Sequence, residues 1–124
     1  MAVRDTVLHS DADFYWCTWE QIERDTGVSP GDEGLPVKLG GASYVHIGAL
    51  GNFDTSLVIT IQGSNDGTNW FACHDLAGNA ATLSASVASR TIGAPPRFLK
   101  PQATTAGAGT DSDVDVFLSA SRRN

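Results

Sequence analysis

The side chains in this sequence that could carry out catalysis lie far apart along the chain. His9, His46 and His74 belong to different segments, and only His74 is followed by a carboxylate, that of Asp75, which could orient an imidazole. Cys17 could act as a nucleophile only beside a histidine and in surroundings that stabilise a thiolate. Since no serine or cysteine motif accompanies the histidines, we expect no enzymatic activity and no cofactor.

A run of three aspartates at alternating positions raises the possibility of a calcium site. Asp111, Asp113 and Asp115 could offer carboxylate oxygens, but a helical calcium loop requires a glycine at its sixth position and a closing glutamate. On a strand, Asp113 and Asp115 would share one face, which we expect to be solvated. The sequence therefore predicts no metal site.

The three tryptophans raise the possibility of a sugar-binding surface, because flat aromatic rings stack on sugar rings. Trp16 and Trp19 would lie on opposite faces of one strand and so cannot form one platform. Trp70 follows a turn and is expected to clamp its base. A place in the core or at an interface is therefore favoured for all three.

The composition indicates a single all-β domain. The chain has 124 residues, of which 41% are apolar, 18% are charged and 13 are glycines. That is enough apolar material for one core, and long helix-forming tracts are missing. Cys17 and Cys73 are expected to be small apolar core residues, although one pair of cysteines leaves a disulfide possible.

The charge pattern argues against nucleic acid as a partner. The formal net charge is −6, and the only adjacent basic residues are Arg122 and Arg123, whereas nucleic-acid binding needs clustered lysine and arginine. No stretch approaches the roughly 20 apolar residues of a membrane span, and residues 1–5 contain no apolar run of a signal peptide. We expect a soluble protein that binds neither nucleic acid nor membrane.

The stretch from Thr55 to Phe71 predicts a β-hairpin. Residues 55–62 are rich in β-branched side chains, which suit a half-buried strand. The pair Asp66-Gly67 is typical of a two-residue primed turn, because glycine adopts a positive φ at little cost. The hairpin residues to which we assign a structural role are Ser64, Asn65, Asp66, Gly67 and Trp70.

Alternating patterns elsewhere predict seven or eight strands and therefore a sandwich of two sheets. The best core candidates are Leu57, Ile59 and Ile61 on one strand and Val114, Val116 and Leu118 on the last. We expect one antiparallel β-sandwich, jelly-roll or immunoglobulin-like, over residues 14–124. Residues 1–13 are predicted to form an extended N-terminal arm, and residues 23–39 a long loop.

The hairpin sequence resembles a pattern in small virion proteins of tailed phages. In that pattern a strand runs into GSNDGTNW, here residues 63–70, and a later arginine–aromatic–proline strand, here 95–101, precedes a last alternating strand, here 114–118. The likeness covers roughly residues 43–120 and is to phage head proteins of the decoration, or cement, type. The turn also resembles those of discoidin-type and carbohydrate-binding sandwiches.

The resemblance implies a structural virion protein that is made in the host cytoplasm and binds the exterior of the capsid. It would form a trimer and stabilise the shell by bridging major capsid protein subunits. Its contacts are expected from the arm and the long loop, through the apolar residues Val3, Val7, Leu8, Val28 and Leu35. A tail, neck or fibre component and a carbohydrate-binding module stay open as alternatives.

Overall fold

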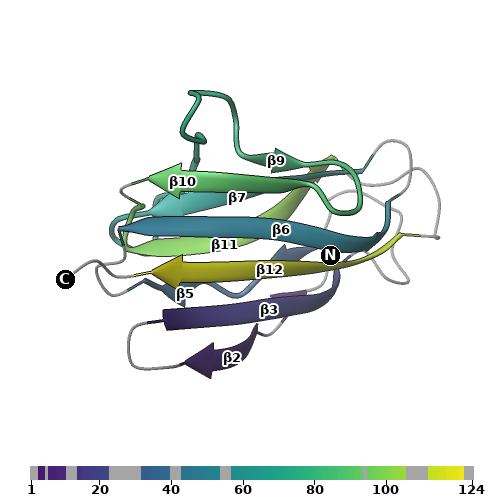
Figure 1. Ribbon diagram of the computed structural model, residues 1–124, viewed down its shortest axis with the longest axis horizontal. Coiled ribbons are helices and arrows are strands. Elements are labelled where there is room, and N and C mark those ends of the chain that lie inside the picture. The colour runs from purple at the N-terminus through teal and green to yellow at the C-terminus, as the bar shows by residue number, and fades with distance from the viewer. Residues whose placement is uncertain are drawn as a thin grey trace.

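The computed structural model describes residues 3–4, 6–10, 14–22, 32–39, 43–53, 57–93, 95–105 and 112–121. Within these ranges the chain forms twelve β-strands and no helix, arranged as two packed sheets (Figure 1). The predicted all-β sandwich is therefore confirmed. In the same ranges, no helix is long and apolar enough to cross a membrane.

We name the two sheets the β7 sheet and the β6 sheet, each after one of its inner strands. The β7 sheet has the order β1 (Val3–Arg4), β4 (Glu33–Gly34), β11 (Phe98–Thr105), β7 (Val58–Ser64) and β8 (Phe71–Ala72). In addition, β5 (Val37–Lys38) pairs with β11, and β9 (Thr82–Leu83) pairs with β7. The β6 sheet has the order β10 (Ser89–Gly93), β6 (Tyr44–Asn52), β12 (Asp113–Ser121), β3 (Phe14–Ile22) and β2 (Thr6–Ser10). Every pairing is antiparallel except the short parallel pair of β1 with β4.

The order of the strands is that of a jelly roll. From β3 onward most connections cross from one sheet to the other, so that β10-β6-β12-β3 faces β8-β7-β11-β4. Two interleaved Greek keys of this kind define the eight-stranded jelly roll. The topology thus decides between the two kinds of sandwich that the sequence left open.

The core lies between the sheets and contains the residues that alternation predicted. Leu57, Ile59 and Ile61 are buried, and so are Val114, Val116 and Leu118. On β6 the buried residues alternate with exposed or half-buried ones along the first six positions. Each sheet therefore turns one face to the core, as the period of two requires.

Trp19 is the largest fully buried side chain and links the core to the 32–39 segment. Its indole is 1% exposed, and its Nε1–H donates a hydrogen bond of 2.9 Å to the carbonyl oxygen of Leu35. A Cβ built on Gly34 would overlap the indole ring and approach Pro101 Cδ to 2.8 Å. Only glycine allows the backbone of β4 to lie this close to the ring.

The predicted arm contributes strands to both sheets. Residues 3–4 form β1 at the edge of the β7 sheet, and residues 6–10 form β2 at the edge of the β6 sheet, where β2 pairs with β3. These strands therefore lie against the sandwich and not apart from it. Strands of two and five residues with weak alternation give little periodic signal, which is why the sequence pattern did not indicate them.

The prediction of one continuous loop over residues 23–39 is wrong for its second half. Residues 33–34 and 37–38 form β4 and β5, which pair with β11, while residues 23–31 lie outside the described part of the chain. Both strands have only two residues, and their pairing depends on the neighbouring β11 more than on any local pattern.

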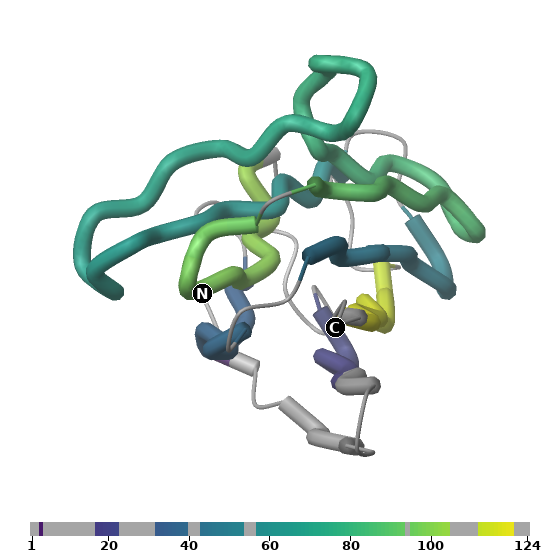
Figure 2. Tube along the Cα trace, turned by 60° about the vertical axis from the view of Figure 1, so that its left-hand side comes forward, coloured from purple at the N-terminus to yellow at the C-terminus, as the bar shows by residue number. Residues whose placement is uncertain are grey.

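The predicted hairpin is present, but its two-residue turn is not. The last paired residues are Gly63 and Phe71, so the connection between β7 and β8 runs over residues 65–70. Gly67 has a φ of +80°, as predicted, but Asp66 does not have the positive φ that a type I′ turn also needs. In Figure 2 this hairpin, in teal, extends to the left beyond the other strands.

Candidate functional site

The five predicted partner-binding residues are only partly within the described structure. Val3 is 50% exposed on β1, and Leu35 is 40% exposed just after β4. Val3 pairs with Glu33 on β4, and Leu35 directly follows this strand. Val3 and Leu35 therefore belong to the same edge of the β7 sheet. Val28 and the side chains of Val7 and Leu8 lie outside the described residues. This edge therefore contains two of the five residues that were predicted to contact a partner.

The hairpin loop is organised by the side chains of Ser64 and Asp66. Ser64 Oγ accepts hydrogen bonds from the backbone N–H groups of Asp66 (3.2 Å) and Gly67 (2.8 Å) and donates one to Asp66 Oδ1 (3.0 Å). Asp66 Oδ1 in turn accepts the N–H groups of Thr68 and Asn69, each at 2.8 Å. Such side-chain bonds to the nearby backbone stabilise a wider turn, which explains why the two-residue turn is absent.

These bonds lower the pKa of the Asp66 carboxyl well below its ordinary value. The largest cause is the backbone N–H of Asn69, followed by that of Thr68, because both donate to the charged carboxylate. A carboxylate with a depressed folded-state pKa contributes stability above its unfolded pKa, near 4, and that contribution is lost as the pH falls toward the folded value.

We therefore expect Asp66→Asn to lower the stability at about pH 7, with a smaller deficit at about pH 2. The measurement is urea unfolding of both proteins at the two pH values. Asn65→Ala, in the same exposed loop, is the control and should show a difference that does not change with pH. A deficit of equal size at both pH values for Asp66→Asn would contradict the role of its charge.

Trp70 lies on the outer face of the β7 sheet, against the cation of Lys100. Lys100 Nζ is 4.4 Å from the centroid of the indole ring and forms an ion pair of 3.2 Å with Glu33. A cation over an aromatic face is an attractive contact, and it places Trp70 against β11 and not only at the base of its own hairpin. Because the ammonium lies over the ring, this face of Trp70 is not open for stacking on a sugar.

The two cysteines are buried as thiols and do not pair with each other. Cys17 belongs to β3, and Cys73 follows β8 in the other sheet. Burial raises the pKa of the Cys73 thiol to about 11. Nucleophilic cysteines have a lowered pKa, so the surroundings of Cys73 act in the opposite direction. The prediction that Cys17 and Cys73 are core residues is confirmed.

Asp113 and Asp115 lie on the outer face of the β6 sheet, as predicted, and Asp111 lies outside the described residues. Asp113 is exposed, and Asp115 Oδ1 accepts a 3.1 Å hydrogen bond from the backbone N–H of Gln21. Gln21 has a φ of 60° at a bulge, where Glu20 and Gln21 both lie opposite Asp115. Among the described residues, no group of three or more potential ligands gathers to hold a metal ion.

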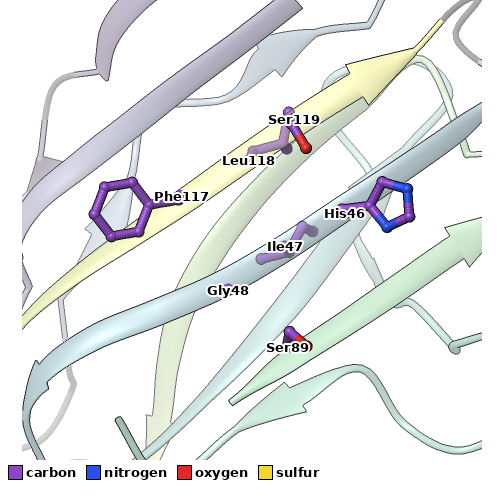
Figure 3. A pocket seen from close by; sticks show the side chains of 7 residues that line it. All are labelled: His46, Ile47, Gly48, Ser89, Phe117, Leu118 and Ser119. Atoms are coloured by element: carbon purple, nitrogen blue, oxygen red, sulfur yellow. The ribbon is translucent and has the colours of Figure 1, made fainter. Parts of the chain in front are cut away.

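The outer face of the β6 sheet is a surface that the sequence reasoning did not single out. Its depression has a volume of roughly 410 Å³ and spans β12, β6 and β10 (Figure 3). Gly48 lies within it, and the side chains of His46, Ser89, Phe117 and Ser119 surround it. Ile47 and Leu118 also line it but are buried in the core. The alternation over residues 44–50 already places Tyr44, His46, Gly48 and Leu50 on one face, which is the signal that indicates this surface.

Exposed apolar side chains lie at both ends of this depression. At one end, Leu50 is exposed on β6, and Val87 lies in the turn before β10, where its N–H donates to the carbonyl oxygen of Ala49 at 2.7 Å. At the other end, Leu76 and Tyr44 flank Gly93. Of the seven large apolar side chains that are exposed in the described residues, four belong to this region: Tyr44, Leu50, Leu76 and Val87. We call the surface formed by these four residues with His46, Gly48 and Phe117 the β6 face.

Comparison with known proteins identifies a shared fold. The chain matches no protein-family model and no curated protein. Among solved structures it is similar to the SPBc2 prophage-derived protein YomS, with a TM-score of 0.54 and 13% identity over 90% of this chain and 97% of that chain. An identity this low establishes similarity of fold only.

Two further structures are more distant. Protein NMB1881 from Neisseria meningitidis has a TM-score of 0.40 and 8% identity, covering 94% of this chain and 81% of that chain. The K3 cleaved adhesin domain of Lys-gingipain from Porphyromonas gingivalis has a TM-score of 0.40 and 10% identity, covering 88% of this chain and 74% of that chain. TM-scores this low support no conclusion about function.

Proposed function

We propose that this protein is a structural component of a phage virion that binds the outside of the capsid and bridges neighbouring major capsid protein subunits. The observation that carries the proposal is the likeness of its fold to a prophage-derived protein over nearly the full length of both chains. The resemblance of the hairpin sequence to phage decoration proteins points in the same direction.

The exposed apolar side chains are distributed in a way that suits bridging. A protein that joins two subunits needs at least two contact areas, and exposed apolar groups gather both at the Val3–Leu35 edge of the β7 sheet and on the β6 face. Each contact can be weak, because attachment at several points, or as a trimer, raises the overall affinity. Binding to the assembled shell but not to free subunits stabilises the shell by linkage.

The test is to mix the purified protein with expanded, undecorated capsids of the phage that encodes it and to image them by cryo-electron microscopy. The proposal expects regular density on the outer shell at local symmetry axes, with threefold density if the protein is a trimer. Bare shells, with all of the protein left in solution, would overturn it. Density only on tails, necks or fibres would replace it with the alternative virion role.

The Val3–Leu35 edge is tested in the same assay by point substitution. Deleting residues 1–12 would also remove two paired strands, so the deletion alone would confuse binding with folding. We expect Val3→Ser combined with Leu35→Ser to lower capsid occupancy without a loss of thermal stability, because both side chains are substantially exposed. Unchanged occupancy would remove this edge from the interface.

A further inference from the structure

We propose that the β6 face is a docking surface for a protein segment that carries one large apolar side chain flanked by lysine or arginine. This inference rests on the proposed function in one respect, since the segment is expected to belong to the capsid subunit. It differs from the contacts predicted at Val3 and Leu35, because those residues lie at the edge of the β7 sheet and the β6 face belongs to the other sheet.

The shape of the β6 face suits a single inserted side chain. The depression is centred on three neighbouring strands and is bounded by the ring of Phe117, the imidazole of His46 and the hydroxyl side chains of Ser89 and Ser119 (Figure 3). It exists because position 48 has no side chain. A Cβ built on Gly48 would lie 3.5 Å from the carbonyl oxygen of Ala88 and 3.9 Å from Ser89 Cβ, which are ordinary contacts. The fold therefore does not require glycine at this position.

The backbone at Val87 adds a second and independent observation. Val87 has a φ of 68° and is 76% exposed. A β-branched residue rarely adopts a positive φ, because the conformation is strained, and such strain is often associated with function. Val87 belongs to the turn over residues 85–88, in which the N–H of Ala88 donates to the carbonyl oxygen of Ala85 at 3.2 Å, and its own N–H donates to the carbonyl oxygen of Ala49 on β6. The turn therefore holds an exposed apolar side chain next to the strand that carries Gly48.

The charges on this side of the molecule determine which partner would fit. Asp113 and Asp115 lie on the outer face of β12, with Asp115 opposite Leu50, and Glu20 is exposed on the neighbouring β3. Among the lysines and arginines whose side chains are described, Arg90 is near the depression, where its Nη1–H donates a 2.7 Å hydrogen bond to the carbonyl oxygen of Ser89. It lies on β10, whereas the aspartates lie on β12, on the other side of β6. Lys38, Arg97 and Lys100 belong to the other sheet or its connections. An apolar group between cations is therefore complementary to this face, whereas an acidic segment is not.

The first test uses a displayed random-peptide library, selected on the wild-type protein and counter-selected on Gly48→Gln, whose side chain fills the depression. We expect enriched peptides with a large apolar residue between basic residues, which bind wild type at least about tenfold more tightly than Gly48→Gln. The control Thr68→Gln, in the exposed hairpin loop, should bind them like wild type. Charge reversal by Asp113→Lys should also weaken binding, and salt should weaken the wild-type complex.

Three results would overturn this inference. They are no enriched peptide, enriched peptides that bind Gly48→Gln as tightly as wild type, and a glycan array on which sugars bind wild type but not Gly48→Gln. The last result would assign the depression to sugar.

Capsid binding then separates the two proposals. Wild-type and Gly48→Gln proteins that occupy capsids equally would leave the proposed function intact and remove the β6 face from its interface. Wild type that fails to bind capsids, but binds basic apolar peptides through Gly48, would overturn the capsid role and retain the docking surface.

Discussion

Replacing Trp19 by alanine is expected to lower the free energy of unfolding by about 3–5 kcal/mol. The side chain is fully buried between the sheets, so its removal leaves a large cavity and also removes the N–H that pairs with the Leu35 carbonyl. Domains of this kind are stable by about 5–15 kcal/mol, so the variant should unfold at much lower urea concentration than wild type. Equilibrium urea unfolding measures the difference.

The control for this prediction is Trp19→Phe, which keeps an aromatic ring but removes the indole N–H. It leaves the Leu35 carbonyl without its donor from Trp19, and we expect a loss of about 1–3 kcal/mol. If Trp19→Ala costs less than Trp19→Phe, the indole does not fill the core in the way described.

Replacing Gly51 by alanine is expected to destabilise the fold by an amount on the order of 3 kcal/mol. Gly51 has a φ of +133°, and a Cβ at this position would overlap the backbone carbonyl oxygen of Asp113 on β12. Strain and overlap therefore act together, and the neighbour is backbone, which cannot rotate away. Thermal or urea unfolding of the variant against wild type tests the prediction.

Gly78→Ala is the matched control, because it separates strain from overlap. Gly78 also has a positive φ, +86°, but nothing lies within 4 Å of a Cβ built there. Only the conformational cost of about 1–2 kcal/mol should appear. Equal losses at Gly51 and Gly78 would show that β12 moves away from Gly51 at no cost.

The sequence was most informative where a strand is long and has one buried face. Alternation over residues 44–50 and 113–119 placed the inward and outward side chains correctly, because a period of two follows from the geometry of any strand. The β-branched run before the hairpin identified β7 for the same reason. The core, the sandwich and the exposure of Asp113 could therefore be predicted from local pattern.

The candidate surfaces could be predicted only in part. The pattern put Tyr44, His46 and Gly48 on one face, but it could not show that Val87 and Leu76 lie at the ends of that face. Val87 reaches it through the bond to Ala49, and Leu76 through the bond from its N–H to the carbonyl oxygen of Thr91. Contacts between segments so far apart along the chain depend on the path of the connections, which no local window contains.

What the sequence determined by itself was the class of the fold, the buried face of each long strand and the position of the main hairpin. These follow from side-chain period and backbone preference, which act over a few residues. Only the tertiary structure decided the jelly-roll order, the pairing of β1, β4 and β5, the six-residue loop held by Asp66 and the depression over Gly48. Each of these depends on which backbone lies beside which, and that is settled by the packing of the whole chain.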